Sequence, residues 1–190
     1  MLDAGCEEVA GQHPAGYPMI AATVYGETSR KLVLAFKHGG KISLAPLLAR
    51  LIASQLGEPQ TYRVIVPVPL HPLRLWRRGY NQAALLGREL ERLGHGRLLV
   101  DGLQRVRSTP PLDHRSRADR QALLATAIRC HPARVARLRS ADILLVDDVL
   151  TSGATSAACA AALRAAGAAC VTVACFARVD AAARQTPGTK

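Results

Sequence analysis

The stretch ILLVDDVLTSGAT, residues 143–155, places two adjacent acids after a short apolar run and follows them with small and hydroxylated residues. Residues 143–146 are aliphatic without alternation, which is typical of a strand buried on both faces of a parallel sheet. Asp147 and Asp148 then lie at the carboxyl end of this strand, where open α/β sheets bind their ligands. The stretch therefore predicts an α/β fold with a binding site at this edge of the sheet.

The turn that follows the acids predicts a phosphate site. It leads into the alanine-rich pattern SAACAAALRAAG, a predicted helix that ends at Gly167. Its small side chains leave backbone N–H groups and hydroxyls facing the ligand, and a helix N-terminus favours an anion. The acids suit neutral hydroxyls or a metal, so a sugar phosphate satisfies both. The alternative is that Thr151 or Ser152 caps the helix and the acids are ordinary strand-end residues. The candidate phosphate-binding residues are Thr151, Ser152, Gly153, Ala154 and Thr155.

Residues 143–155 resemble the ribose-phosphate signature of the type I phosphoribosyltransferases, which bind 5-phosphoribosyl 1-pyrophosphate (PRPP). The resemblance implies that Asp147 and Asp148 hold the ribose 2′ and 3′ hydroxyls and that 151–155 holds the 5′-phosphate. It also implies Mg²⁺ bound through PRPP. We expect a type I phosphoribosyltransferase-like fold, with a central, mostly parallel sheet flanked by helices.

The alternation of predicted strands and helices independently indicates a right-handed parallel sheet within one domain. We expect an irregular stretch at 1–19, the domain at 20–180 and a tail at 181–190. The predicted strands cover 19–25, 62–68, 98–106, 143–146 and 169–179, and the predicted helices cover 27–40, 42–56, 81–94, 118–128 and 156–167. Asn81 is the predicted cap of its helix, and Pro46 fits only in a first turn. Lys37 and His38 are expected at an exposed helix end, the alternative being that they line the acceptor side of the site. Trp76 is expected to anchor the loop that carries it, the alternative being that it stacks a base.

Further stretches resemble the ComF family of competence and DNA-utilisation proteins. They are LAFKHGGK (34–41), VIVPVPLHPLRLWRRGYNQAALLGREL (64–90), RVRSTPP (105–111) and SRADR (116–120). Together with 143–155 they follow the family's order over roughly residues 30 to 178. Two sets of residues are candidates for contacts to pyrophosphate or the acceptor: Arg77, Arg78 and Asn81 in one stretch, and Arg105, Arg107, Arg117 and Arg120 in a closing lid. The alternatives are helix capping and solvated charge for the first set, and a solvated basic loop for the second.

The chain also departs from the ComF pattern. Val9 stands where the C-x-x-C partner of Cys6 would be, so no structural zinc is expected, because such a site needs four ligands. The cysteines are predicted to be small buried residues without disulfides. Leu112 and Leu123 replace the family's usual polar residues in and after the arginine-rich loop. These replacements leave open whether a PRPP site at 147–155 is catalytic.

Composition supports two classes of function. The 190 residues carry 25 basic and 14 acidic side chains, a net charge of +11 that favours polyanions such as phosphorylated ligands and single-stranded DNA. Without an apolar run of membrane-spanning length, and with an acidic start, the chain is expected to be cytoplasmic and not inserted in a membrane. One hypothesis is a phosphoribosyltransferase that acts on a nitrogen acceptor. The other is a non-catalytic PRPP-binding accessory of DNA uptake or utilisation, which binds single-stranded DNA or DNA-uptake proteins. No oligomeric state is predicted.

Overall fold

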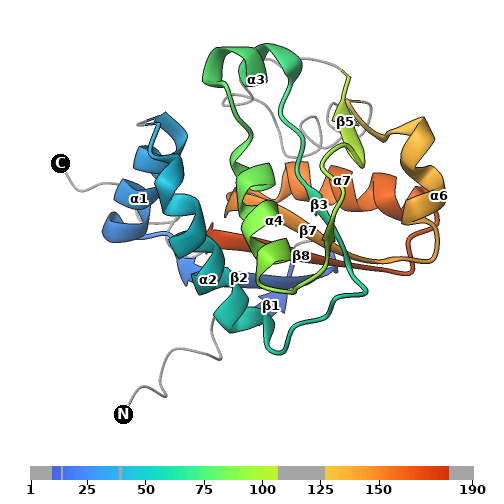
Figure 1. The fold of residues 1–190 in the computed structure, drawn as a ribbon, viewed down its shortest axis with the longest axis horizontal. Coiled ribbons are helices and arrows are strands. Elements are labelled where there is room, and N and C mark those ends of the chain that lie inside the picture. The colour runs from blue at the N-terminus through green and yellow to red at the C-terminus, as the bar shows by residue number, and fades with distance from the viewer. Residues whose placement is uncertain (1–9, 14, 39, 107–126, 180–190) are drawn as a thin grey trace.

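The computed structural model describes residues 10–13, 15–38, 40–106 and 127–179, and its centre is a six-stranded sheet (Figure 1). The strand order is β1–β2–β8–β7–β3–β4, and every pair except the antiparallel β1–β2 is parallel. In this order the strands span Ala10–Gln12, Pro18–Val24, Cys170–Arg178, Asp142–Leu150, Val64–Pro67 and Arg97–Leu98. The mostly parallel sheet flanked by helices confirms the predicted fold class.

Helices cover both faces of the sheet because β7 is apolar on both. Leu144 and Val146 pack into a core with α1, α2 and α4, whereas Ile143 and Leu145 pack into a second core with α7. All four side chains are fully buried, which confirms the predicted strand. The helices span Glu27–His38 (α1), Ala45–Leu56 (α2), Gln82–Arg92 (α4) and Ala154–Ala165 (α7).

Two helix starts follow the sequence prediction. Asn81 caps α4, since its side-chain oxygen accepts a hydrogen bond from the N–H of Ala83 at 3.0 Å. The 3-10 helix η1 (Ile42–Leu44) precedes α2, and Pro46 occupies the first turn of α2, where its missing N–H costs nothing. Local capping chemistry therefore fixes these boundaries.

The remaining described elements lie outside the six-stranded sheet. They are α3 (Pro72–Arg78), the antiparallel pair β5 (Leu103–Arg105) and β6 (Ile128–Cys130), the 3-10 helix η2 (Pro132–Arg134) and α6 (Val135–Leu138). In Figure 1, α3 and β5 lie at the same end of the molecule. The strand predicted at 98–106 is divided between β4 and β5. Most of the helix predicted at 118–128 lies outside the described residues, and Ile128 begins a strand instead.

The sheet begins earlier than the predicted boundary at residue 20. Ala10–Gln12 forms an antiparallel hairpin with β2, with Gln12 opposite Pro18. The strand β2 then pairs with β8, so Ala10–Gln12 and the first residues of β2 are part of the six-stranded sheet. The residue that follows β1, His13, also brings the hairpin into contact with α7, beside the candidate site.

Candidate functional site

The two acids lie in the second half of β7, where the local backbone holds one oxygen of each. Asp147 Oδ1 accepts a hydrogen bond from the N–H of Asp148 at 2.9 Å, and Asp148 Oδ1 accepts one from the N–H of Val149 at 2.8 Å. Asp148 is buried and Asp147 is half-buried. Their carboxylates are thus oriented before any ligand arrives, and the second oxygen of each remains for other contacts.

Lys37 meets the second oxygen of Asp148. Its Nζ, at the end of α1, lies 3.0 Å from Asp148 Oδ2, and its side chain is only 27% exposed. The approach has ion-pair distance without hydrogen-bond geometry, so this buried oxygen has no hydrogen-bond partner among the described residues. Sequence reasoning had placed Lys37 at an exposed helix end, and that expectation is wrong.

The carboxyl of Asp147 has an unusual proton affinity. Burial raises its pKa to about 8, the negative charge of Asp148 adds to the rise, and the positive charge of Lys37 opposes it. Two adjacent acids cannot both ionise cheaply. The raised pKa favours the protonated form of Asp147, which can donate a hydrogen bond as well as accept one.

The turn after β7 leaves the start of α7 without a side-chain cap. The N-cap is Gly153, with φ of 73°, which provides no side-chain cap for the first turn. Thr151 is exposed, while Ser152 and Thr155 are half-buried. The alternative that Thr151 or Ser152 caps this helix is therefore not what the structure has. Unsatisfied N–H groups at a helix start favour a bound anion.

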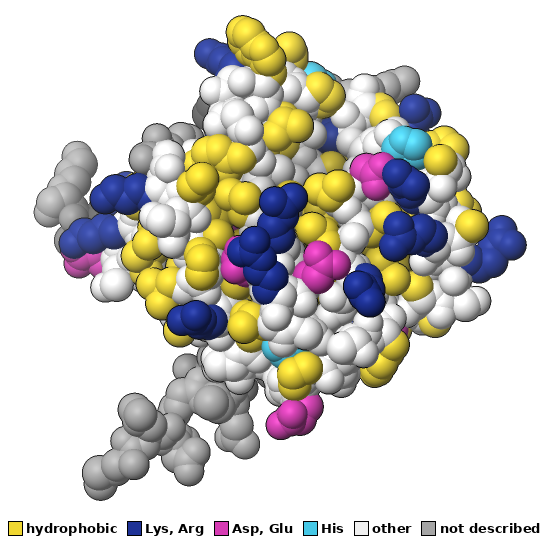
Figure 2. Space-filling view, in the orientation of Figure 1, with side chains coloured by type: hydrophobic (Ala, Val, Ile, Leu, Met, Phe, Trp, Pro, Cys, Tyr) yellow, Lys and Arg dark blue, Asp and Glu magenta, His cyan; other side chains and the backbone are white. Residues whose placement is uncertain are grey.

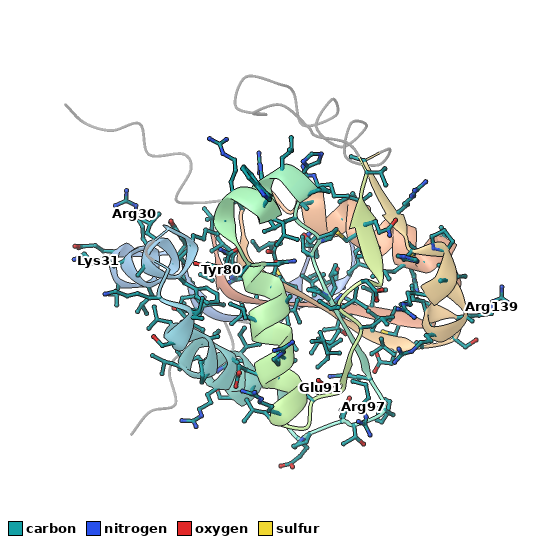
Figure 3. All side chains as sticks on the ribbon, turned by 45° about the horizontal axis from the view of Figure 1, so that its top comes forward. Arg30, Lys31, Tyr80, Glu91, Arg97 and Arg139 are labelled. Carbon is teal, nitrogen blue, oxygen red and sulfur yellow. The ribbon has the colours of Figure 1, made fainter. Side chains whose placement is uncertain are left out.

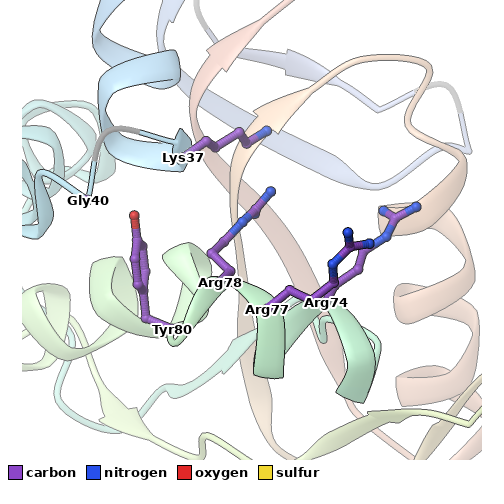
Figure 4. A pocket seen from close by; sticks show the side chains of 6 residues that line it. All are labelled: Lys37, Gly40, Arg74, Arg77, Arg78 and Tyr80. Atoms are coloured by element: carbon purple, nitrogen blue, oxygen red, sulfur yellow. The ribbon is translucent and has the colours of Figure 1, made fainter.

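A pocket of about 560 Å³ adjoins the acids and contains four cationic side chains. It is lined by Lys37, Gly40, Arg74, Arg77, Arg78 and Tyr80, and we call it the cation pocket. Figure 4 shows Lys37 and Arg78 extending into the same space from α1 and α3. Because Lys37 also contacts Asp148, the cation pocket and the paired acids share one side chain.

Two hydrogen bonds fix the walls of the cation pocket. Tyr80 donates its hydroxyl to the carbonyl of Phe36 in α1 at 2.6 Å, and Arg78 donates Nη1 to Gln82 Oε1 at 2.8 Å. Figure 3 shows Tyr80 on the side of α4 that faces α1. These bonds connect α1 to the segment that follows α3, so the arginines of α3 are held opposite Lys37.

Comparison with known proteins gives the family. No family model matches the chain. Competence protein F of Haemophilus influenzae is 31% identical over 156 residues, covering 79% of this chain and 68% of that protein. DNA utilization protein YhgH of Escherichia coli K12 is 30% identical over 179 residues, covering 91% and 77%. The chain belongs to the ComF family. The Salmonella typhi YhgH protein is also similar, at 31% over 180 residues.

Solved structures add little to the ComF assignment. The protein TT1426 of Thermus thermophilus is 17% identical and aligns over 77% of this chain and 85% of its own, with a TM-score of 0.40. A likeness of that size carries no argument about fold or function. The fold therefore rests on the strand order and helix placement of this ComF chain itself.

The other predicted site residues of this ComF chain lie apart from the cation pocket or outside the described residues. Asn81 has a structural role, because it caps α4 and donates Nδ2 to the carbonyl of Val68 at 3.0 Å. Arg105 is half-buried and lines a separate cavity of about 760 Å³ together with His71 and Asn81. Burial lowers the pKa of Arg105, and the nearby charge of Arg74 lowers it further. Arg107, Arg117 and Arg120 lie outside the described residues.

The paired acids offer oxygen ligands for a metal. Within the described parts of the chain, no group of three or more His, Cys, Asp and Glu side chains is arranged to hold a metal. The paired carboxylates are oxygen donors of the kind Mg²⁺ takes, and the buried Oδ2 of Asp148 without a hydrogen bond fits such a ligand. Cys6 and Val9, on which the zinc prediction rests, lie outside the described residues.

The four described cysteines are free thiols, but two of them, Cys130 and Cys170, are not fully buried. Cys159 and Cys175 are buried as predicted, Cys130 is half-buried, and Cys170 is exposed at the start of β8. Its expected burial is wrong because the first residue of the strand lies at the rim of the sheet. No helix in the described ranges is both long and apolar enough to cross a membrane.

Proposed function

We propose that the chain binds PRPP and transfers its phosphoribosyl group to a nitrogen acceptor with release of pyrophosphate. The observation that supports this best is the order of three neighbouring features, which matches the order of three parts of PRPP. The turn 151–155 suits the 5′-phosphate, the acids at 147 and 148 suit the ribose hydroxyls, and the cation pocket suits pyrophosphate. Lys37 connects the last two features, since it contacts Asp148 and lines the cation pocket.

The reaction requires the protein to orient the sugar and to stabilise the negative charge of the departing pyrophosphate. The bond from C1′ to the pyrophosphate oxygen breaks, and its electron pair leaves with pyrophosphate. The lone pair of the acceptor nitrogen forms the new C1′–N bond, and the nitrogen loses a proton to solvent. Arg74, Arg77 and Arg78 would stabilise the departing negative charge through charge-assisted hydrogen bonds. Asp147 and Asp148 would hold the ribose so that the acceptor meets the face opposite pyrophosphate.

The fit to a metal extends this proposal. Mg²⁺ bound through the oxygens of PRPP would neutralise part of the pyrophosphate charge. Asp147 and Asp148 are the residues of this chain whose oxygens could contact it directly or through water. No side chain is assigned as the general acid or base.

Binding and turnover are tested separately. PRPP with Mg²⁺ should raise the melting temperature, because a ligand bound only to the native state stabilises it. The double variant Asp147→Asn/Asp148→Asn should lose this effect, whereas the control Asp101→Asn, at an ion pair with Arg134, should keep it. Release of pyrophosphate from PRPP with a panel of nitrogenous bases then tests transfer. Equal PRPP affinity in the wild type and the double variant would refute the site.

A second candidate function is binding of single-stranded DNA, and the surface of α3 favours it. Trp76 is 84% exposed and Leu73 is 63% exposed, on the helix that carries Arg74 and Arg77. Trp76 thus does not anchor its loop as expected. Exposed aromatic rings beside arginines can stack bases while the charges meet phosphates. Figure 2 shows the other basic side chains spread over the visible face, so the net charge of +11 by itself indicates no particular surface.

The relatives' names agree with this second candidate, since they refer to competence and DNA utilisation. Single-stranded DNA should bind with an affinity that falls steeply as salt rises. Trp76→Ala should weaken binding by roughly tenfold or more, because stacking contributes about 1–3 kcal/mol per base. The control Tyr62→Ala removes another exposed aromatic ring, at 70% exposure, and should have no effect. Equal losses in both variants would remove α3 as the binding surface.

A further inference from the structure

A buried histidine from the N-terminal hairpin lies directly beneath the turn 151–155. His13 is 2% exposed and follows β1. Its Nε2 lies 2.9 Å from the hydroxyl of Ser156, in the first turn of α7, and the hydroxyl of Ser156 donates to the carbonyl of Gly153 at 3.0 Å. A chain of two hydrogen bonds thus connects the hairpin to the N-cap of α7, and the first of them joins residues 143 positions apart in sequence.

The backbone assigns the tautomer of this histidine. The N–H of Ala15 points at His13 Nδ1 at 3.1 Å, and a backbone N–H can only donate. Nδ1 must then accept, so Nε2 carries the proton and donates to Ser156 Oγ. Ser156 in turn can donate to Gly153, whose carbonyl also accepts from the N–H of Ala157 at 2.8 Å. The donor and acceptor roles in all of these hydrogen bonds are consistent with a neutral imidazole.

The imidazole also limits what can stand at residue 153. A Cβ built on Gly153 would lie 2.5 Å from His13 Nε2 and 2.9 Å from Cε1, which is far inside contact distance. The φ of 73° at Gly153 is a conformation that L side chains rarely adopt. The turn therefore packs directly against the imidazole ring, and the ring and the hydroxyl of Ser156 together fix the Gly153 peptide.

We propose that His13 is a positioning residue for the phosphate turn: through Ser156 it holds the Gly153 peptide so that the N–H groups at the start of α7 face the 5′-phosphate. The imidazole is buried and does not itself contact the ligand. This inference rests on the proposed function, because it assigns a specific end of PRPP to this turn. It gives the N-terminal hairpin a part in binding that its distance in sequence conceals.

The test uses two probes that report on opposite ends of the site. Ribose 5-phosphate requires the turn 151–155, whereas inorganic pyrophosphate with Mg²⁺ requires the cation pocket. In calorimetry, His13→Asn and Ser156→Ala should each weaken the binding of ribose 5-phosphate about tenfold, in line with the loss of one or two hydrogen bonds. Pyrophosphate affinity should stay within about twofold of the wild type. The double variant should lose no more than either single variant, because both break the same chain.

A conservative variant separates positioning from general stability. The amide nitrogen of Gln reaches about as far as Nε2 of histidine, whereas that of Asn does not, so His13→Gln should recover most of the ribose 5-phosphate affinity. If His13→Asn does not fold, Ser156→Ala decides, since it removes one buried oxygen and adds no volume. Wild-type affinity for ribose 5-phosphate in Ser156→Ala, or parallel loss of both probes, would overturn the inference. A wild type that binds neither probe would instead refute the proposed function on which the inference rests.

Discussion

Replacing Asp147 by Asn should abolish a pH dependence of stability that has an unusual sign. Burial raises the pKa of Asp147 to about 8 in the folded protein, against an ordinary value of 3.8. Between these values the native state binds a proton that the unfolded state has released. The free energy of unfolding must therefore fall as pH rises through this range. The usual carboxylate, whose pKa folding lowers, behaves in the opposite way.

The magnitude follows from a single proton. One proton of difference changes the free energy of unfolding by about 1.4 kcal/mol per pH unit, so from about pH 6.5 to 8 the wild type should lose about 2 kcal/mol at most. The range starts at pH 6.5 because the contribution of His95 also changes with pH below that value. Burial lowers the pKa of His95 below its ordinary 6.5, so the stabilisation that it contributes rises with pH up to 6.5 and is constant above it.

Urea unfolding followed by circular dichroism across this pH range measures the effect. Asp147→Asn should show no fall relative to wild type, because the amide does not titrate. Asp101→Asn is the matched control: a hydrogen bond from Arg134 lowers the pKa of Asp101, so its contribution is complete above pH 3.8 and lost only as pH falls below it. Parallel curves for wild type and Asp147→Asn would refute the shifted pKa and the neutral state of this acid.

Three further predictions concern binding, packing and reactivity. Lys37→Met should weaken pyrophosphate about tenfold or more in calorimetry, since it removes one of four cations from the cation pocket; an unchanged affinity would exclude Lys37 from that role. Gly96→Ala should lower the free energy of unfolding by about 1–3 kcal/mol, because its Cβ would lie 2.7 Å from the backbone oxygen of Arg63, whereas Gly26→Ala has open space and should not. At pH 8, iodoacetamide should label the exposed Cys170 and spare Cys175, whose pKa burial raises to about 12; mass spectrometry showing equal labelling would contradict this.

The sequence predicted best what depends on neighbours along the chain. The strand at 143–146, the helix capped by Asn81 and the helix start at Pro46 were predictable because period, cap and proline act locally. The sequence predicted a turn at 151–155, but it did not predict that the helix after this turn has no side-chain cap. The N-cap could have been Thr151 or Ser152 from sequence, and the positive φ that makes Gly153 the N-cap is visible only in the structure.

The helix α3 was missed because its apolar residues do not face a core. Leu73, Leu75 and Trp76 are exposed, so their spacing gave no buried stripe. The available signal was at its ends. His71 accepts a hydrogen bond from the N–H of Leu73 at 3.3 Å, Pro72 occupies the first turn, and Gly79 ends the helix in the left-handed region. Histidine, proline and glycine at these positions fit a short helix as well as the predicted loop.

The two contacts that complete the site join residues far apart in sequence, Lys37 to Asp148 and His13 to Ser156, and no spacing rule could have paired them. The first contact has a consequence for binding. Lys37 cannot at the same time neutralise Asp148 and interact at full strength with pyrophosphate in the cation pocket. On the proposed function, pyrophosphate would draw Lys37 away and release Asp148 Oδ2 for a ribose hydroxyl or Mg²⁺. The two ends of PRPP would then favour each other's binding by a coupling free energy that neither end has alone. A molecule that carries both groups gains this coupling, and a free phosphate or a free sugar does not.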